Sequence, residues 1–188
     1  MLTYADVIEA LTGNRPEAAS LMISEAAIDS RQVIPAGMFV ALPGEHVDGH
    51  DYVPQAFERG AHLALVQKDI RYNIPVIDLH DRIASPQMTI PNPPFCLKVE
   101  DTLMAMQKIA AFWRRKLNIR VIGITGSVGK STTKELIAEV LSQRFRVLRN
   151  VGNLNNEIGL PLTLLRLGPG YQTAVLEMGF YVPGEITF

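Results

Sequence analysis

The sequence predicts an α/β protein with two domains, the second built on a parallel sheet with a phosphate-binding loop. Short apolar segments alternate with segments whose apolar residues recur at helical spacing, a pattern typical of parallel sheets. A glycine-rich turn, "GSVGK", interrupts this alternation near the middle of the chain. The length of 188 residues allows one large or two small domains, each with a core of its own. We place the first domain at 1–100 and the second at 101–188.

Composition excludes several classes of protein. A net charge of −1 gives no reason to expect a nucleic acid as partner, which would need clustered Lys and Arg. Cys96 is the only cysteine, so no disulfide forms within the chain. Asp6 and Glu9 interrupt the amino-terminal apolar residues, which therefore do not read as a signal peptide. Without any run of about 18 apolar residues, we expect no membrane span and a cytoplasmic protein.

The first domain begins with a capped helix. Thr3 and Asp6 fit a helix start, Tyr4 and Val7 begin an apolar face, and Gly13 ends the helix. Three short apolar strands follow, at "MFVALPG", "AHLALVQ" and "IPVIDL". A short helix ended by Gly60 precedes the second of them.

A proline-rich segment separates the two domains. "HDRIASPQMTIPNPPF", at 80–95, contains four prolines and little periodicity, so we expect a surface loop. The next segment, "DTLMAMQKIAAFWRRKL", carries Leu103, Met106, Trp113 and Leu117 on one helical stripe. We interpret that stripe as core rather than as a ligand site.

The second domain reads as strand, glycine turn and helix, in "IRVIGIT", "GSVGK" and "STTKELIAEVLSQR". The strand "RVLRN", an asparagine-rich loop, "IGLPLTLLRL" and the strand "TAVLEM" follow. Such alternation predicts a parallel sheet with right-handed crossovers. With about three strands, this domain is predicted to be incomplete.

The turn between the first strand and helix of this domain is suited to a nucleoside triphosphate. A helix start presents unpaired N–H groups and a positive dipole end to an anion. Gly126 and Gly129 allow the dihedrals of such a cradle, Lys130 can reach the outer phosphates, and Ser131 offers a hydroxyl to Mg²⁺. Ile124 stands where a strict phosphate loop has its first glycine. The alternative is a tight strand–helix turn with an exposed lysine.

Four segments resemble the Mur ligase family, whose ATP-binding loop is shared with folylpolyglutamate synthases. They are "GITGSVGKSTTKE", "GNLNNEIGLPLTLL", "LEMGFYVPGEI" and the first-domain stretch "DSRQVIPAGMFVALPGEHVDGHDYVPQAFERGAHLALV". The resemblance covers most of Ile28 to Ile186 and is strongest to the branch that adds D-Ala-D-Ala. It implies a small UDP-substrate-binding domain followed by an ATPase domain.

The resemblance also implies a reaction, cofactors and catalytic residues. ATP with Mg²⁺ would phosphorylate the terminal carboxylate of UDP-MurNAc-tripeptide, and D-Ala-D-Ala would attack the acyl phosphate to form an amide. Lys130 and Glu177 are the expected catalytic residues, with Ser131 and Glu177 as metal ligands. Glu177 ends an apolar strand, where ligands gather in open α/β sheets. The residues expected to hold the ATP phosphates are Gly126, Ser127, Gly129, Lys130, Ser131 and Thr132.

Nine residues are expected to contact or surround the UDP-linked substrate. They are Ser30, Arg31, Gly44, Asp48, Gly49, His50, Asn153, Asn155 and Asn156. A plain turn remains an alternative for the asparagines. A surface salt bridge for Arg31 and a hydrogen-bonded loop histidine for His50 are alternatives as well.

The family pattern extends beyond 188 residues. It implies the rest of the ATPase domain and a third domain for D-Ala-D-Ala, so we expect a fragment that is inactive alone. Alternatives are another Mur-type ligase, a folylpolyglutamate synthase relative, or a non-catalytic module that binds a nucleotide or UDP-sugar. The oligomeric state is left open.

Overall fold

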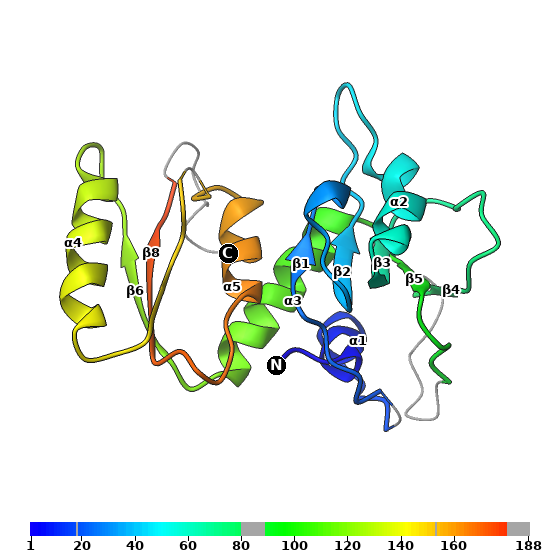
Figure 1. Cartoon of the computed structure of the whole chain (residues 1–188), viewed down its shortest axis with the longest axis horizontal. Coiled ribbons are helices and arrows are strands. Elements are labelled where there is room, and N and C mark those ends of the chain that lie inside the picture. Colours follow the sequence, from blue (N-terminus) through cyan, green and yellow to red (C-terminus); the bar gives the residue numbers. More distant parts are fainter. Residues whose placement is uncertain (18, 80–88, 153, 180–188) are drawn as a thin grey trace. The chain divides into compact units, whose positions relative to one another are not determined.

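The chain forms two compact α/β units, Met1–Ile109 and Ala110–Phe188, which we call unit 1 and unit 2 (Figure 1). The computed structural model describes residues 1–17, 19–79, 89–152 and 154–179. The division falls inside helix α3 (Thr102–Lys116), a few residues after the domain boundary expected at 100/101.

Helix α1 (Tyr4–Thr12) opens unit 1 and has both ends fixed by its sequence. Thr3 Oγ1 accepts a hydrogen bond from the N–H of Asp6 at 3.2 Å, and Asp6 Oδ2 accepts one from the N–H of Thr3 at 2.9 Å. This reciprocal capping box satisfies two amides at the helix start. Gly13 ends the helix with φ at 77°, a left-handed dihedral that glycine adopts without strain.

Five parallel strands make the sheet of unit 1, in the order β1-β2-β3-β5-β4. Their bounds are Ala26–Ala27 (β1), Gly37–Val40 (β2), Ala61–Val66 (β3), Val76–Asp78 (β4) and Phe95–Lys98 (β5). Strands β2 and β3 are almost continuously apolar because both faces of the sheet are covered.

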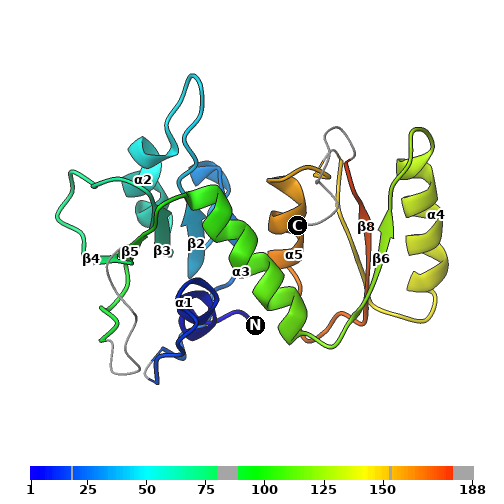
Figure 2. The same cartoon turned by 180° about the vertical axis from the view of Figure 1, so that it is seen from behind.

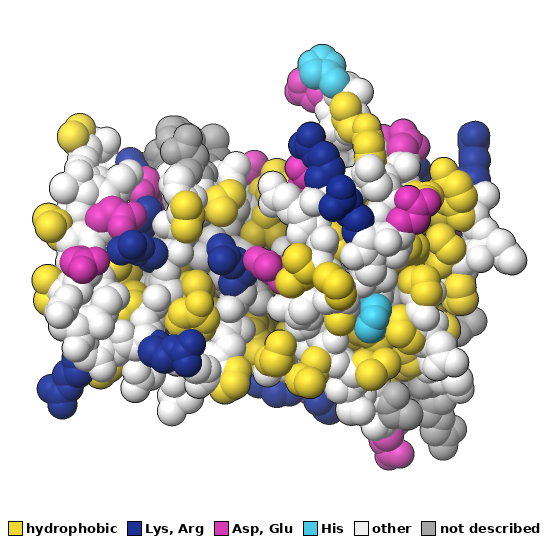
Figure 3. Space-filling view, in the orientation of Figure 1, with side chains coloured by type: hydrophobic (Ala, Val, Ile, Leu, Met, Phe, Trp, Pro, Cys, Tyr) yellow, Lys and Arg dark blue, Asp and Glu magenta, His cyan; other side chains and the backbone are white. Residues whose placement is uncertain are grey.

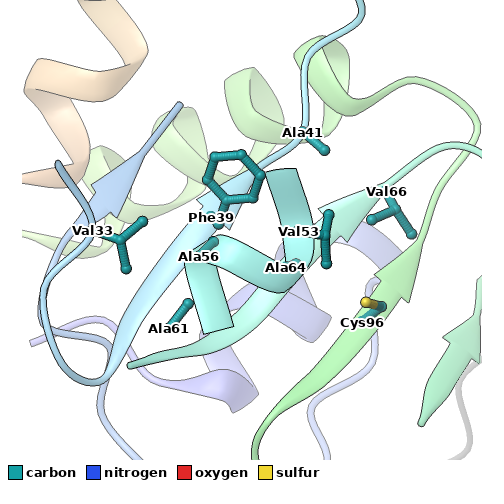
Figure 4. Close-up of a cluster of buried hydrophobic side chains, with 9 residues drawn as sticks. All are labelled: Val33, Phe39, Ala41, Val53, Ala56, Ala61, Ala64, Val66 and Cys96. Atoms are coloured by element: carbon teal, nitrogen blue, oxygen red, sulfur yellow. The ribbon is translucent and has the colours of Figure 1, made fainter. Parts of the chain in front are cut away.

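The side chains of these strands alternate between two cores. One face packs against α2 (Val53–Glu58) through a cluster that includes Phe39, Ala64 and Cys96 (Figure 4). On the opposite face, the Tyr4 ring of α1 meets the Phe95 ring edge-on, with centroids 5.3 Å apart. Strands β3 and β5 are therefore buried on both faces at the centre of unit 1.

Strand β5 was not predicted from the sequence. It begins at Phe95, the last residue of the loop expected at 80–95, of which 80–88 lie outside the described residues. Four residues directly after two prolines are too short to show a period. The strand nevertheless lies between β3 and β4, where parallel pairing supplies the order that local sequence lacks.

Two short 3₁₀ helices, η1 (Ser30–Gln32) and η2 (Gly49–Tyr52), follow β1 and β2 and pack against α2. Between β2 and η2 the chain makes a projecting loop, 42–49, closed by an antiparallel bridge between Pro43 and Asp48. Its tip carries a histidine and an acidic side chain, with basic side chains near its base in the same view (Figure 3).

Unit 2 contains a three-stranded parallel sheet in the order β6-β8-β7. The bounds of its elements are Arg120–Ile124 (β6), Lys130–Ser142 (α4), Val147–Arg149 (β7), Gly159–Leu165 (α5) and Thr173–Glu177 (β8). Helices α4 and α5 lie on opposite sides of the sheet (Figures 1 and 2). The parallel sheet expected from the alternation is confirmed.

Helix α3 buries the centre of the stripe that we interpreted as core, while Leu103 and Leu117 at its two ends are partly buried. Met106 and Ile109 are inaccessible to solvent, and Trp113 is 3% exposed. The indole Nε1 of Trp113 donates to the carbonyl of Leu167 at 2.8 Å, which satisfies the one polar atom of that side chain. Among the described residues, no helix combines the length and the apolar character needed to cross a bilayer.

Candidate functional site

The turn between β6 and α4 has the backbone geometry of an anion cradle. Gly126 and Gly129 have φ of 142° and 83°, dihedrals that strongly favour glycine. Gly129 is the N-cap of α4, and no side chain caps this end of the helix. The first amides of α4 therefore remain for an external acceptor, at the positive end of a helix of 13 residues.

Lys130 turns back over this loop. Its Nζ donates to the carbonyl of Gly126 at 2.7 Å, so the ammonium lies at the loop rather than away from it. Ser127, Ser131 and Thr132 are exposed around it. The loop thus combines amides, hydroxyls and one cation, which are the groups that bind a phosphate.

Glu177 lies beside the loop because of strand register. Strands β6 and β8 pair in parallel with Ile124 opposite Glu177, so the acid is level with the start of the loop. The residue is 3% exposed. Its Oε1 accepts a hydrogen bond from Asn155 Nδ2 at 2.9 Å, whereas the buried Oε2 has no hydrogen-bond partner among the described residues.

The surroundings of Glu177 favour its ionised form. Burial by itself would raise the pKa of the carboxyl, but the Ser131 hydroxyl, the Asn155 amide and the charges of Lys134 and Lys130 outweigh it and lower that pKa. An ionised oxygen without a donor is therefore held next to the phosphate loop.

This oxygen is the feature that fits a divalent cation. Mg²⁺ takes oxygen ligands, and near phosphates it takes few from protein. The buried Oε2 lies 3.9 Å from the Lys134 ammonium, which is an ion pair too long for a hydrogen bond, so no donor of the described residues occupies its lone pairs. Glu177 Oε2 and the neighbouring Ser131 hydroxyl supply such a pair of oxygens.

The asparagine-rich loop borders the same site. Asn155 contacts Glu177 as described, and Asn156 Oδ1 accepts a hydrogen bond from the N–H of Gly159, at the start of α5. Asn153 lies outside the described residues. The structure therefore brings Asn155 to the carboxylate, while the side chain of Asn156 stabilises the turn into α5.

In unit 1, Ser30 and Arg31 occupy the short helix η1. Ser30 Oγ is buried and donates to Gln55 Oε1 of α2 at 2.6 Å. Arg31 is exposed and forms a two-pronged ion pair with Asp29, which lowers the pKa of Asp29 to about 2. This pair holds the guanidinium in a fixed direction at the surface.

Asp48 and His50 form a compact network at η2. Asp48 Oδ1 accepts from the N–H of His50 at 2.9 Å and contacts His50 Nδ1, while Oδ2 pairs with the Lys68 ammonium. His50 Nε2 accepts from the N–H of Gln67 at 3.0 Å, so the ring proton is on Nδ1. Both ring nitrogens are thus engaged within the chain, and His50 shapes the loop from beneath.

Replacing Asp48 by asparagine is expected to lower the free energy of unfolding at pH 7 by about 1 kcal/mol, because charge-assisted bonds to Lys68 and His50 are lost. Burial acts to raise the pKa of Asp48, but these partners lower it well below its ordinary value. The folded state therefore binds the proton less readily than the unfolded chain, and the difference shrinks as pH falls below about 4. Urea titrations at pH 7 and pH 3 measure it. An equal difference at both values would contradict the assignment.

Gly44 and Gly49 shape the projecting loop 42–49. The N–H of Gly44 donates to the carbonyl of Val47 at 3.1 Å and closes the tip. A Cβ on Gly49 would lie 2.7 Å from the carbonyl oxygen of Leu42, so the two arms of the loop approach too closely for any side chain there.

Two polar residues of unit 2 were missed by the sequence reasoning. Lys134 and Asn150 are 2% and 0% exposed, and both contact Glu177. A signal for Lys134 existed, since it lies four residues before Ala138 on the buried stripe of the second-domain helix. A charged residue at a core position of a helix indicates a specific partner.

Two models of the Mur ligase family match the chain. The model described as "Mur ligase family, catalytic domain" matches residues 22–114, and "Mur ligase middle domain" matches residues 124–186. Together they cover most of both units, including the loop 42–49 and the phosphate loop.

Several curated relatives carry the name UDP-N-acetylmuramoyl-tripeptide–D-alanyl-D-alanine ligase. The protein from Synechocystis sp. is 42% identical over 166 residues, which are 88% of this chain and 33% of that protein. The protein from Bacillus subtilis is 40% identical and covers 98% of this chain and 37% of its own length. The chain thus spans about a third of the length of these relatives.

Solved structures give the same result. MurF from Acinetobacter baumannii superimposes with a TM-score of 0.75 at 30% identity, over 99% of this chain and 37% of that one. MurF from Thermotoga maritima in complex with ADP has a TM-score of 0.67 at 28% identity, over 95% and 34% of the two chains. The motifs, the parallel α/β fold, the family models and these relatives agree, and the chain belongs to the Mur ligase family.

Proposed function

We propose that this chain supplies the UDP-substrate site and the phosphate loop of an ATP-dependent ligase that adds D-Ala-D-Ala to UDP-MurNAc-tripeptide. The observation that carries the proposal is the meeting of an uncapped helix start with a buried carboxylate that has one unbonded oxygen. The names of the relatives supply the substrates. We expect the reaction to take place in the cytoplasm, where ATP is available.

The proposed chemistry has two steps. The terminal carboxylate of the tripeptide attacks the γ-phosphorus of ATP, which breaks the bond to ADP and gives an acyl phosphate. The amine of D-Ala-D-Ala then attacks the acyl carbon, loses a proton and expels inorganic phosphate as the amide forms. Both steps require that negative charge on the phosphoryl oxygens be offset in a site protected from water.

Each residue of the loop has a part in this proposal. The amides from Gly126 to Thr132 and the Lys130 ammonium would hold the β- and γ-phosphates. Ser131 and Glu177 would hold Mg²⁺, which when bound spreads the charge of the phosphates over itself. Asn155 keeps the Glu177 carboxylate oriented through its 2.9 Å hydrogen bond.

Unit 1 would hold the uridine diphosphate end of the substrate. Arg31 is exposed, already fixed by Asp29, and offers its outer N–H groups to a phosphate. Ser30, Asp48 and His50 have their polar atoms engaged within the chain, so we assign them to shaping η1 and the loop 42–49. Gly44 and Gly49 permit the close turns of that loop.

Calorimetry on the chain and on Lys130→Ala tests the phosphate site. The variant is expected to lose about 10- to 100-fold in affinity for Mg-ATP, since a charge-assisted contact to a polyphosphate is worth roughly 1.5–3 kcal/mol. Binding of UDP-MurNAc-tripeptide should change less than about threefold, because Lys130 belongs to unit 2.

Lys108→Ala is the matched control, because Lys108 is an exposed lysine of unit 1, outside the phosphate loop. It should bind Mg-ATP like the parent chain. Equal affinity of the parent and Lys130→Ala for Mg-ATP would remove Lys130 from the phosphate site and overturn the proposal.

A further inference from the structure

A buried lysine lies beneath the phosphate loop, one helical turn after Lys130. Lys134 is 2% exposed and projects from the face of α4 that packs on the sheet. Burying an ammonium costs several kcal/mol unless its charge and donors are compensated. Ala138, the next buried residue on this face of α4, is apolar. The contacts of the Lys134 ammonium explain why a lysine stands at position 134.

The ammonium of Lys134 is compensated by one hydrogen bond and two ion pairs, with partners from three segments. Nζ donates to the backbone carbonyl of Asn150 at 2.8 Å and lies 3.2 Å from Glu135 Oε1. The third is Glu177 Oε2, at 3.9 Å. That distance is too long for a hydrogen bond, so Oε2 experiences the positive charge but is not occupied by a donor.

Asn150 extends this contact to the backbone of Glu177. Its Oδ1 accepts from the N–H of Glu177 at 2.9 Å, and its Nδ2 donates to the carbonyl of the same residue at 2.9 Å. The amide also donates to the carbonyl of Leu154 at 2.8 Å. One fully buried side chain thus fixes the end of β8 and the asparagine-rich loop together.

We propose that Lys134 and Asn150 are positioning residues for the metal-binding carboxylate. Lys134 fixes Asn150, Asn150 fixes the backbone of Glu177, and Asn155 fixes Oε1, which leaves Oε2 without a donor among the described residues. This inference rests on the proposed function for the identity of the metal site. The network itself is a property of the chain without any ligand.

Lys134 is not a ligand-contacting residue in this arrangement. Its ammonium is enclosed by protein, whereas Lys130 stands at the loop surface. The two lysines therefore have different tasks: Lys130 faces the phosphates, and Lys134 keeps the carboxyl group of Glu177 in place. Substitutions of Lys130 and of Lys134 should therefore change the affinities for metal-free ATP and for Mg-ATP in different ways.

The first test is hydrogen exchange by NMR on the parent chain and on Lys134→Met, which keeps the length of the side chain but not its charge. The N–H of Glu177 and the side-chain amide of Asn150 should lose at least tenfold protection in the variant. Amides of the β6–β8 ladder, such as that of Val175, should change less than about threefold. Lys108→Met is the matched control and should leave all of them unchanged.

The second test is the effect of magnesium on nucleotide affinity. We expect the ratio of the Kd for ATP in EDTA to that in Mg²⁺ to fall at least fivefold in Lys134→Met, with affinity for metal-free ATP nearly kept. Lys134→Arg, which retains charge and donors, should recover part of the ratio. If the parent chain binds no ATP at all, the proposed function fails, and the exchange data still decide the positioning role.

Two outcomes would overturn the inference. One is unchanged protection of Asn150 and Glu177 in Lys134→Met. The other is a uniform loss of protection over unit 2, which would make Lys134 a general stabilising residue only. Should Lys134→Met not fold, the parent chain decides: a slowly exchanging ammonium signal of Lys134, coupled to the carbonyl of Asn150, is expected, and its absence would contradict the proposal.

Discussion

Replacing Glu177 by glutamine is expected to abolish the magnesium dependence of nucleotide binding by this chain. Glutamine keeps the size of the side chain and can accept the hydrogen bond from Asn155, but it removes the charge next to Ser131. Loss of residues that only orient a metal ligand typically costs 10–100-fold in metal affinity. Loss of the ligand charge itself should cost at least about 100-fold, measured as the Mg²⁺ concentration that half-saturates the ATP complex.

The matched control for this variant is Glu139→Gln. Glu139 is an exposed acid of the same helix α4 and is not part of the network around Lys134, so its loss removes an equal charge without touching the proposed metal ligand. We expect its half-saturating Mg²⁺ concentration to stay within about threefold of the parent value. If Glu177→Gln and Glu139→Gln had the same effect, the role of Glu177 would reduce to general charge, contrary to our assignment.

Gly159→Ala is expected both to destabilise unit 2 and to disturb the candidate site around Glu177. A Cβ at this position would lie 2.4 Å from the Cα of Leu154 and 2.7 Å from its carbonyl carbon, so the backbone has to move. Overpacking of this kind costs roughly 1–3 kcal/mol, and contact with backbone places this case at the upper end. The loop that would shift carries Asn155, the partner of Glu177.

Urea denaturation followed by tryptophan fluorescence measures this change, since Trp113 is buried in unit 2 against the carbonyl of Leu167. Gly168→Ala is the control, because a Cβ there meets nothing within 4 Å, and its effect should stay below about 0.5 kcal/mol. A Gly159→Ala chain as stable as the parent would show that the loop relaxes freely, and the close approach would then have no structural role.

Local chemistry explains which elements could be predicted. The capping box at Thr3, the glycine stop at Gly13 and the phosphate loop are each contained in a few adjacent residues, and the structure has the first two as predicted. The buried stripe of α3 was also readable from its period. Strand β5 could not be predicted, because its place in the sheet depends on pairing with β3 and β4.

In the candidate site, too, residues marked by local sequence could be predicted, and residues defined by long-range contacts could not. Glu177 was found because the end of an apolar strand is visible in sequence, and strand register then places it level with the loop. The residues that hold it were not found, since Lys134 and Asn150 meet it only through contacts 43 and 27 positions apart, across α4, β7 and β8. Sequence reasoning also assigned His50 to the substrate, whereas its ring nitrogens are engaged by Asp48 and Gln67. We therefore propose that His50 shapes the loop beside the UDP site, and its place around the substrate stays a prediction.

The solvent-inaccessible Cys96 gives this chain a built-in reporter of transient opening. Its side chain packs between α2 and the central strands, and burial raises the pKa of the thiol to about 12. A thiol reagent can therefore attack only in molecules where the face of the sheet that α2 covers has opened. The rate of labelling at increasing reagent concentration would measure how often unit 1 opens. Ligands that stabilise unit 1 would slow the labelling.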